Sequence, residues 1–374
     1  MSTADRTTNV EPIAEGAEPD VVGPMLADAF HDQRWENCQI ALISGGKSNL
    51  TYRVRSDAGE VILRRPPLGH ILPTAHDMGR EYRVLTALHG SDVPVPRTLL
   101  LGDAESALGV QFYVMERVVG HICRETLPAG YAETPAERAA VGAALIDVLA
   151  SLHTIDPESV GLEDFGRPAG FMERQLRCWG EQWERSKTSE LRALDELLES
   201  LRATLPTEGR AAIVHGDYRL DNTMLHPSQP GQIVAVLDWE MSTLGDPLAD
   251  LGALLAYWSE DDDDDALVRA RIVPPVTAAP GFPTRADVIE EYARRSGFDV
   301  SSIGWYQAFA FFKLAIICQG IAARVAGGAM LGPGFDLPPG LVEALIEAGL
   351  RQLELAGMLA RRHAHDSLEV GPDP

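Results

Sequence analysis

The chain has 374 residues, 45% of them hydrophobic, and a formal net charge of −23. This length suits two or three domains or one enzyme of two lobes, and the hydrophobic fraction is ordinary for a globular protein. The negative charge argues against nucleic acid or an anionic membrane surface as the main partner. The four cysteines are scattered without a C-x-x-C pair, which indicates reduced thiols, and we expect a cytoplasmic protein.

The first third of the chain predicts a small β-rich lobe. Residues 1–20 are polar without an apolar period, so we expect disorder there, followed by a short helix over 22–31. Alternating or β-rich segments predict five strands, over 38–43, 50–55, 61–65, 98–101 and 111–115. One helix is predicted after the third strand, over 77–88.

The rest of the chain is predicted to be mostly helical. Apolar periodicity predicts helices over 134–153, 171–186, 189–204, 247–258, 285–295, 302–325 and 339–362. Thr134 and Glu137 form a capping box at the start of the first of these. The acidic run Asp261–Asp265 is expected in a solvated, mobile loop, and 363–374 is expected to be a disordered tail.

The most apolar stretch is 305–317, extended to Ala323. It carries Lys313 and Gln319 and is short for a membrane span, so we expect a buried helix and no membrane partner.

The main catalytic signal is the run His215-Gly-Asp217-Tyr-Arg-Leu-Asp-Asn222, followed by Leu-Asp238-Trp-Glu. A kinase that phosphorylates a hydroxyl needs a carboxylate to take the acceptor's proton. It also needs an amide and a second carboxylate to hold magnesium on the nucleotide phosphates. Asp217, Asn222 and Asp238 supply those groups in that order. The alternative is an ordinary turn and strand end, but the combined spacing favours the kinase.

The residues around this motif are expected to position it. A hairpin with strands over 223–226 and 232–237 would bring Asp238 back beside Asn222, so that one metal ion could touch both. We expect His215 to orient the loop through hydrogen bonds. Asp246 can cap the following helix, and Asp250 can hold the loop through backbone N–H groups. A zinc site on His215 and His226 lacks a third ligand at a familiar spacing.

The stretch 215–251, which ends in Gly245-Asp-Pro-Leu-Ala-Asp-Leu251, resembles the aminoglycoside phosphotransferase and choline kinase family. This is the small-molecule branch of the protein-kinase-like fold, and the resemblance extends from about Ile40 to about Leu355. The segment 166–179 resembles the subgroup whose members also occur fused to acyl-CoA dehydrogenases.

This resemblance implies an α+β fold of two lobes. A small antiparallel β-sheet lobe with one helix, 21–118, would bind the nucleotide, and a larger, mainly helical lobe, 119–362, would carry catalysis and the acceptor. The implied cofactors are ATP or GTP and Mg²⁺, and the implied partner is a small-molecule acceptor; the oligomeric state stays open.

The resemblance also places a nucleotide site on the small lobe. The loop Ser44-Gly45-Gly46-Lys47-Ser48 would cradle phosphates, because paired glycines let the backbone approach closely. It is not a P-loop, since the first glycine of that motif would fall at Ala41. Arg64 takes the place of the usual kinase lysine, with Glu81 as its ion-pair partner. Alternatively, Glu81 is an exposed helical residue.

The end of the small lobe resembles a kinase hinge. Adenine would bond the backbone of Glu116 and Val118, next to Met115. Met224 would form the floor under the adenine, and ordinary core packing is compatible with that role.

The acceptor site is open. Arg174, Gln175, Arg177 and Trp179 could bind an anionic hydroxyacyl-CoA or hydroxy acid, although solvated surface charge is the plain alternative. Glu240 could touch a second metal, line the acceptor site or be structural. The acidic charge after Val118 could instead attract a cationic aminoglycoside. A nucleotide-binding pseudokinase is a further alternative, for which Arg64 is the main argument.

Overall fold

The computed structural model describes residues 15–43, 49–68, 77–187, 191–326 and 337–366, with side chains described to residue 357. The predicted phosphate loop, Ser44–Ser48, lies outside these residues. The chain divides into two compact units, Met1–Ser91 with Val95–Val119, and Asp92–Pro94 with Gly120–Pro374.

The first unit is built on a five-stranded antiparallel sheet. Its strands, in spatial order, are β1 (Gln39–Leu42), β2 (Leu50–Ser56), β3 (Gly59–Arg65), β5 (Phe112–Glu116) and β4 (Thr98–Gly102). Each predicted strand is present, with ends that differ by one or two residues. The β2–β3 turn closes with Ser56 opposite Gly59, which has a φ of +138° that suits glycine.

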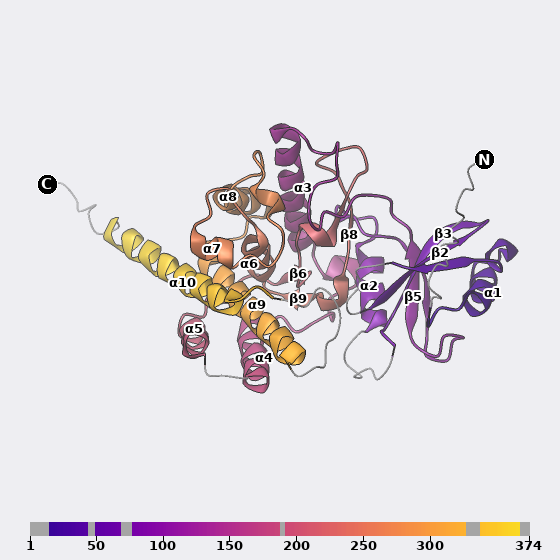
Figure 1. Cartoon of the computed structure of the whole chain (residues 1–374), viewed down its shortest axis with the longest axis horizontal. Helices are drawn as coiled ribbons and strands as arrows, with labels where there is room; N and C mark the ends of the chain where they lie inside the picture. The colour runs from indigo at the N-terminus through magenta and orange to yellow at the C-terminus, as the bar shows by residue number, and fades with distance from the viewer. Residues whose placement is uncertain (1–14, 44–48, 69–76, 188–190, 327–336, 367–374) are drawn as a thin grey trace, which may run out of the picture. The chain divides into compact units, whose positions relative to one another are not determined.

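Two helices cover opposite faces of this sheet (Figure 1). Helix α1 (Pro19–Phe30) packs on the face that carries Val54 and Leu63. Helix α2 (Met78–Leu88) packs against β4 and β5 on the other face. Because alternate strand residues point to opposite faces, Arg64 lies on the α2 side while Leu63 lies on the α1 side.

Part of the segment expected to be disordered is ordered. Ala17 is fully buried in the α1 core cluster, and the Tyr52 hydroxyl donates to the Glu15 carbonyl at 2.6 Å. The polar composition hid this contact because a single buried alanine gives no apolar period.

The second unit is mainly helical. Its helices are α3 (Pro135–Thr154), α4 (Phe171–Ser186), α5 (Arg192–Ala203), α6 (Leu248–Tyr257), α7 (Asp265–Arg269), α8 (Arg285–Ser296), α9 (Ile303–Ala326) and α10 (Leu341–Asp366). The predicted capping box is present, with Thr134 and Glu137 bonded reciprocally. Residues 363–366 were expected in a disordered tail but are helical, because α10 runs to Asp366.

Two short antiparallel pairs position the catalytic motif in this unit. They are β6 (Ala212–Val214) with β9 (Thr243–Gly245), and β7 (Thr223–Leu225) with β8 (Ile233–Val236). The motif 215–222 runs from β6 into β7, and Asp238 follows β8 directly. The β7–β8 hairpin was predicted, whereas the β6–β9 pair was not.

The helix α9 differs from the predicted helix 302–325 by one residue at each end. Within the 23 residues Ile303–Val325, the most apolar window of 18 residues has a mean hydropathy of 1.6, and by length and composition alone this helix would suffice to cross a membrane. The expectation that this stretch is too short and too polar to span a membrane is therefore wrong. However, 56% of its most apolar window is buried within the chain, and it packs on α6 and α10 (Figure 1). Core helices of soluble proteins have these same properties, and the expectation of a buried helix agrees with this packing.

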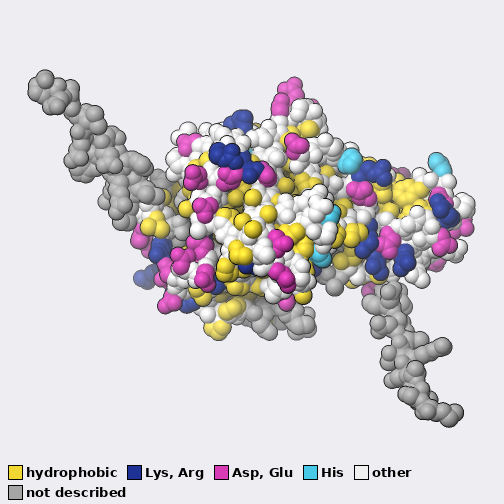
Figure 2. Space-filling view, turned by 90° about the horizontal axis from the view of Figure 1, so that it is seen from above, with side chains coloured by type: hydrophobic (Ala, Val, Ile, Leu, Met, Phe, Trp, Pro, Cys, Tyr) yellow, Lys and Arg dark blue, Asp and Glu magenta, His cyan; other side chains and the backbone are white. Residues whose placement is uncertain are grey.

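The acidic run is more ordered than expected. The carboxylate of Asp263 is 1% exposed and lies 2.9 Å from an Arg271 nitrogen and 2.7 Å from an Arg285 nitrogen. Asp264 caps α7 by accepting from two backbone N–H groups. Asp261, Asp262, Asp264 and Asp265 are exposed, but Asp263 is not, so the expectation of a wholly solvated loop is wrong. On the face shown in Figure 2, acidic side chains are scattered among apolar and neutral ones.

Candidate active site

A buried carboxylate accepts hydrogen bonds from the backbone of the catalytic motif. Asp250, in the first turn of α6, accepts hydrogen bonds from the backbone N–H of His215 at 2.6 Å and of Gly216 at 2.8 Å. His153 of α3 lies 3.2 Å from the same carboxylate, and its other ring nitrogen lies 2.7 Å from the Tyr292 hydroxyl. The predicted contact of Asp250 with the loop backbone is therefore present. Asp246 also accepts from the Leu248 N–H at 3.0 Å, near the start of α6.

His215 links the two halves of the motif. Its Nδ1 accepts from the Asp217 N–H at 3.2 Å, and its Nε2 lies 2.9 Å from the Leu237 carbonyl oxygen. The first contact assigns the ring proton to Nε2, which then donates to Leu237. The ring packs on Trp239 at 4.7 Å between centroids. These contacts orient the loop relative to the residue before Asp238.

Asp217 and Asn222 are brought together. The side-chain amide of Asn222 donates to the backbone oxygen of Asp217 at 2.8 Å and to its carboxylate at 2.9 Å. Because the amide nitrogen makes both bonds, the amide oxygen of Asn222 remains the end that can bind a cation.

The hairpin places Asp238 next to this pair. Thr223 pairs with Val236, and the Leu237 N–H donates to the Asn222 carbonyl at 2.8 Å. Asp238 then takes a left-handed conformation, with φ 64° and ψ 62°. A non-glycine residue in this region is held there by its surroundings and often marks a functional site.

The chemistry of these donors fits magnesium. Mg²⁺ is usually held by one or two protein oxygens, with nucleotide phosphates and water completing its shell. Among the described residues there is no group of three or more His, Cys, Asp or Glu side chains arranged to hold a metal. Asn222 and Asp238 therefore suit a magnesium–nucleotide complex better than a closed protein site such as structural zinc.

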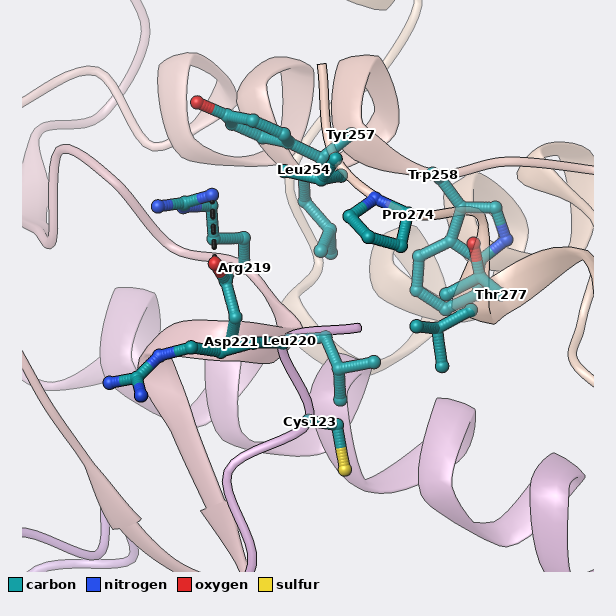
Figure 3. Close-up of a pocket in the computed structure, with 12 residues that line it drawn as sticks. Cys123, Arg219, Leu220, Asp221, Leu254, Tyr257, Trp258, Pro274 and Thr277 are labelled. Carbon is teal, nitrogen blue, oxygen red and sulfur yellow. Dashed lines mark ion pairs between the residues drawn. The ribbon is translucent and has the colours of Figure 1, made fainter. Parts of the chain in front are cut away.

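The structure adds Arg219, which the sequence analysis did not select. Its guanidinium lies 3.3 Å from the Asp217 carboxylate and 3.0 Å from that of Asp221, and sits 4.7 Å from the Tyr257 ring centre (Figure 3). Burial raises the pKa of Asp221, and the charge of Arg219 opposes that rise. The pocket in Figure 3 is about 30 Å³, which is room for water rather than for a substrate. The sequence feature that could have indicated Arg219 as a site residue was its charge, two positions after Asp217.

Lys313 of α9 is the second residue that the sequence analysis missed as a site residue. Its Nζ donates to the Gly216 carbonyl at 3.1 Å and lies 5.5 Å from the Trp179 ring centre. The sequence feature that could have indicated Lys313 as a site residue was its place as a lone lysine in the most apolar stretch of the chain.

In the first unit, the predicted ion pair between Arg64 and Glu81 is present. Arg64 Nε lies 2.9 Å from a Glu81 carboxylate oxygen. Glu81 is only 2% exposed and also accepts from the Asn49 amide at 2.8 Å and the Tyr113 hydroxyl at 2.9 Å. The alternative of an exposed Glu81 is therefore wrong.

The predicted adenine contacts occupy different environments. Met115 is buried on β5, Glu116 ends that strand, and Val118 is half-buried beyond it. The Glu116 N–H donates to the Arg97 carbonyl at 2.9 Å. In the second unit, Met224 packs tightly on Gly120, where an added Cβ would lie 2.4 Å from Met224 Cγ.

The predicted acceptor residues differ in whether their side chains could reach an acceptor. The guanidinium of Arg174 bonds to the backbone carbonyls of Arg167 and Ala169, so it ties α4 to the loop before it. Gln175 accepts from the Trp179 indole N–H at 3.2 Å. Arg177 is exposed on α4, and Glu240 is exposed in the short turn that follows Asp238.

Gly216 should be intolerant of a side chain. Its φ is +86°, and an added Cβ would lie 2.7 Å from Met241 Cβ and 2.8 Å from the Met241 carbonyl. We expect Gly216→Ala to reduce the free energy of unfolding by about 1–3 kcal/mol, through backbone strain and the clash. Gly297→Ala is the matched control, since Gly297 has φ +71° and open space around it. Urea unfolding of both variants measures the difference, and an equal loss in the two would contradict a tight Gly216 site.

The comparison with protein families decides the broad class. Residues 39–281 match the model of a family described as "Phosphotransferase enzyme family". The chain belongs to this family. The match spans both the predicted nucleotide residues of the first unit and the motif that carries Asp217, so the family resemblance read from the sequence is confirmed.

The curated relatives with extensive similarity are longer than this chain. Acyl-CoA dehydrogenase family member 11 of Rattus norvegicus is 37% identical over 82% of this chain. The aligned part is 39% of that relative, so the chain spans about two fifths of its length. The predicted subgroup resemblance is therefore also confirmed.

Solved structures confirm the α+β, protein-kinase-like fold. A Ralstonia eutropha protein, provisionally assigned as an aminoglycoside phosphotransferase, is 34% identical with a TM-score of 0.72. That match covers 85% of this chain and 93% of the other. A mutant aminoglycoside phosphotransferase in ternary complex with ADP and hygromycin B is 14% identical, with a TM-score of 0.55, covering 89% and 98%. This more distant match concerns the fold alone.

Proposed function

We propose that this chain is an ATP- or GTP-dependent phosphotransferase that moves the γ-phosphate to a hydroxyl of a small molecule. The contact between Asn222 and Asp217, 2.9 Å between the amide nitrogen and the carboxylate, carries this proposal. Together with Asp238 on the adjoining hairpin, it supplies a base and two magnesium ligands within one unit. Family membership supports the reaction type.

Asp217 accepts the proton of the acceptor hydroxyl, or orients that hydroxyl toward the phosphate. Catalysis of this kind depends mostly on positioning and on electrostatic stabilisation of the moving phosphoryl group. His215 and Asp250 support it by fixing the loop backbone. Magnesium, held by Asn222 and Asp238, would neutralise charge on the nucleotide phosphates.

The nucleotide is bound by the first unit in this proposal. Arg64, held by Glu81, replaces the usual lysine and can grip phosphate oxygens with a planar fork. The loop Ser44–Ser48 would cover the phosphates, while Glu116 and Val118 contact the adenine through their backbone. The proposed lobes are 21–118 for nucleotide and 119–362 for catalysis and acceptor.

The acceptor class we favour is a hydroxyacyl-CoA or hydroxy acid. Its support is the similarity to chains named as acyl-CoA dehydrogenase family members. An aminoglycoside-type antibiotic kinase is the second candidate, supported by the Ralstonia eutropha structure at 34% identity. We also propose that the protein is cytoplasmic.

The proposed metal ligands make a direct prediction. Asp238→Ala should weaken magnesium–nucleotide binding more than Asn222→Ala, because it removes a charge as well as an oxygen from the ion's shell. Losing a residue that merely supports a metal ligand costs about 10–100-fold in affinity, and we expect the loss of Asp238 to cost at least that much. Calorimetric titration with nucleotide, with and without magnesium, measures the effect. Wild-type affinity in Asp238→Ala would remove Asp238 from the site.

Nucleotide turnover tests the reaction type. Release of ADP or GDP should rise when an accepted hydroxyl compound is added. Nucleotide binding without turnover on any acceptor would instead favour a pseudokinase, and phosphorylation of a polycationic sugar would favour the antibiotic kinase.

A further inference from the structure

The ammonium group of Lys313 lies against the catalytic loop. Lys313, in the middle of α9, donates from Nζ to the Gly216 carbonyl at 3.1 Å and sits 5.5 Å from the centre of the Trp179 ring. Its neighbours Phe312 and Leu314 are buried. The lysine Nζ ends at the peptide group that joins Gly216 to Asp217.

No protein carboxylate forms an ion pair with this ammonium within the part of the chain that the structure describes, at a limit of 4.0 Å. Burial lowers the pKa of Lys313, while the more distant charges of Asp217 and Asp250 oppose that shift. Lys313 is half-buried, and a partly desolvated cation without a bonded anion is costly to the folded state. Such a cost at a catalytic loop is typical of groups that serve a ligand.

Gly216, whose N–H donates to Asp250, also faces the turn after Asp238. Met241 approaches it closely, with its carbonyl oxygen 2.8 Å from where a Gly216 Cβ would stand. Met241 is nevertheless 45% exposed, which is high for a large apolar side chain beside a buried loop. Trp179 is half-buried on α4. The Lys313 ammonium therefore lies between the Gly216 carbonyl and the Trp179 ring, and Met241 lies on the other element that contacts Gly216.

We propose that Lys313 binds an anionic group of the acceptor, and that Trp179 and Met241 contact an apolar part of the same molecule. This inference rests on the proposed function and assigns its acceptor specificity to one residue. The class that fits is a hydroxy acid with an apolar chain, in which the carboxylate stands a few bonds from the hydroxyl. Lys313 takes the role that the sequence analysis gave to Arg174, whose guanidinium is committed to backbone carbonyls.

The test compares acids with their neutral esters. Hydroxydecanoates with the hydroxyl on carbons 2 to 5, and the methyl ester of each, are titrated calorimetrically into the full chain with magnesium and a non-hydrolysable ATP analogue. Wild type should bind one acid about 10–100-fold more tightly than its ester, the range for a hydrogen bond to a charged group. Lys313→Met should lose most of that preference, and Lys313→Arg should keep part of it.

The control is Arg324→Met. Arg324 is exposed near the end of the same helix, so this variant changes the net charge equally without touching the loop. It should keep the wild-type preference for the acid. Thermal melting checks that Lys313→Met is folded, which we expect because it removes a partly desolvated charge.

Two results would overturn the inference. One is an acid preference that survives in Lys313→Met, which would leave Lys313 as a loop anchor only. The other is a wild type that binds neither member of any pair, or binds them equally. Because binding is measured without turnover, a failure of the proposed function appears separately, as acid binding without any phosphorylated product.

Discussion

Asp217→Asn should keep the fold and bind magnesium–nucleotide, while turnover falls by roughly 10²–10⁴, the usual range for losing a general base. The replacement keeps the size of the side chain and one acceptor oxygen, so the hydrogen bond from Asn222 can survive. Arg219 loses a charged partner but keeps Asp221 at 3.0 Å. Asp217→Asn should therefore impair proton transfer and leave the structure of the loop intact.

Turnover is measured as phosphorylated acceptor, with nucleotide affinity measured in parallel. Arg219→Lys is a useful companion, because it retains a positive charge beside Asp217 while losing the planar fork. If Asp217→Asn turns over at close to the wild-type rate, Asp217 is not the base.

Asp250→Asn should be among the most destabilising single substitutions in the second unit. Asp250 accepts from the N–H groups of His215 and Gly216 and contacts His153, all in a buried setting. An amide cannot accept on both sides, so at least one buried donor loses its partner. We expect the free energy of unfolding to fall by about 3–5 kcal/mol. Asp262→Asn, on the exposed acidic run, is the control and should change stability little.

The same carboxylate predicts how stability depends on pH. Burial would raise the pKa of Asp250, but the hydrogen bond from His153 and the other contacts outweigh it and hold that pKa below its ordinary value. A lowered pKa in the folded state stabilises the protein above the unfolded pKa of about 4, and this contribution is lost as the pH falls further. Wild type should therefore lose more stability between pH 5 and pH 3 than Asp250→Asn does. Equal losses in urea unfolding at the two pH values would contradict this assignment.

Local sequence signals predicted those parts of the structure that local physics determines. The capping box at Thr134, the strands of the first unit and the hairpin that returns Asp238 to Asn222 all follow from short-range patterns. The pairing of Arg64 with Glu81 required the family resemblance, because the two residues come from different elements. The functional roles of these residues stay predictions.

What the sequence could not predict depends on contacts between distant segments. Lys313 and Gly216 are 97 residues apart, and no local pattern relates an apolar helix to the catalytic loop. Asp263 looked like one of several solvated aspartates, yet two arginines from later in the chain bury it. Arg174 looked available from helical spacing alone, whereas its guanidinium folds back onto the preceding loop.

The central claim is that this chain transfers a phosphoryl group to the hydroxyl of a small molecule. The most direct test is to incubate the purified chain with ATP or GTP, magnesium and a metabolite extract, and to search by mass spectrometry for phosphorylated products. We predict a new product that gains one phosphoryl group, that depends on nucleotide and magnesium, and that disappears with Asp217→Asn. An extract without any such product, despite tight binding of magnesium–nucleotide, would contradict the account.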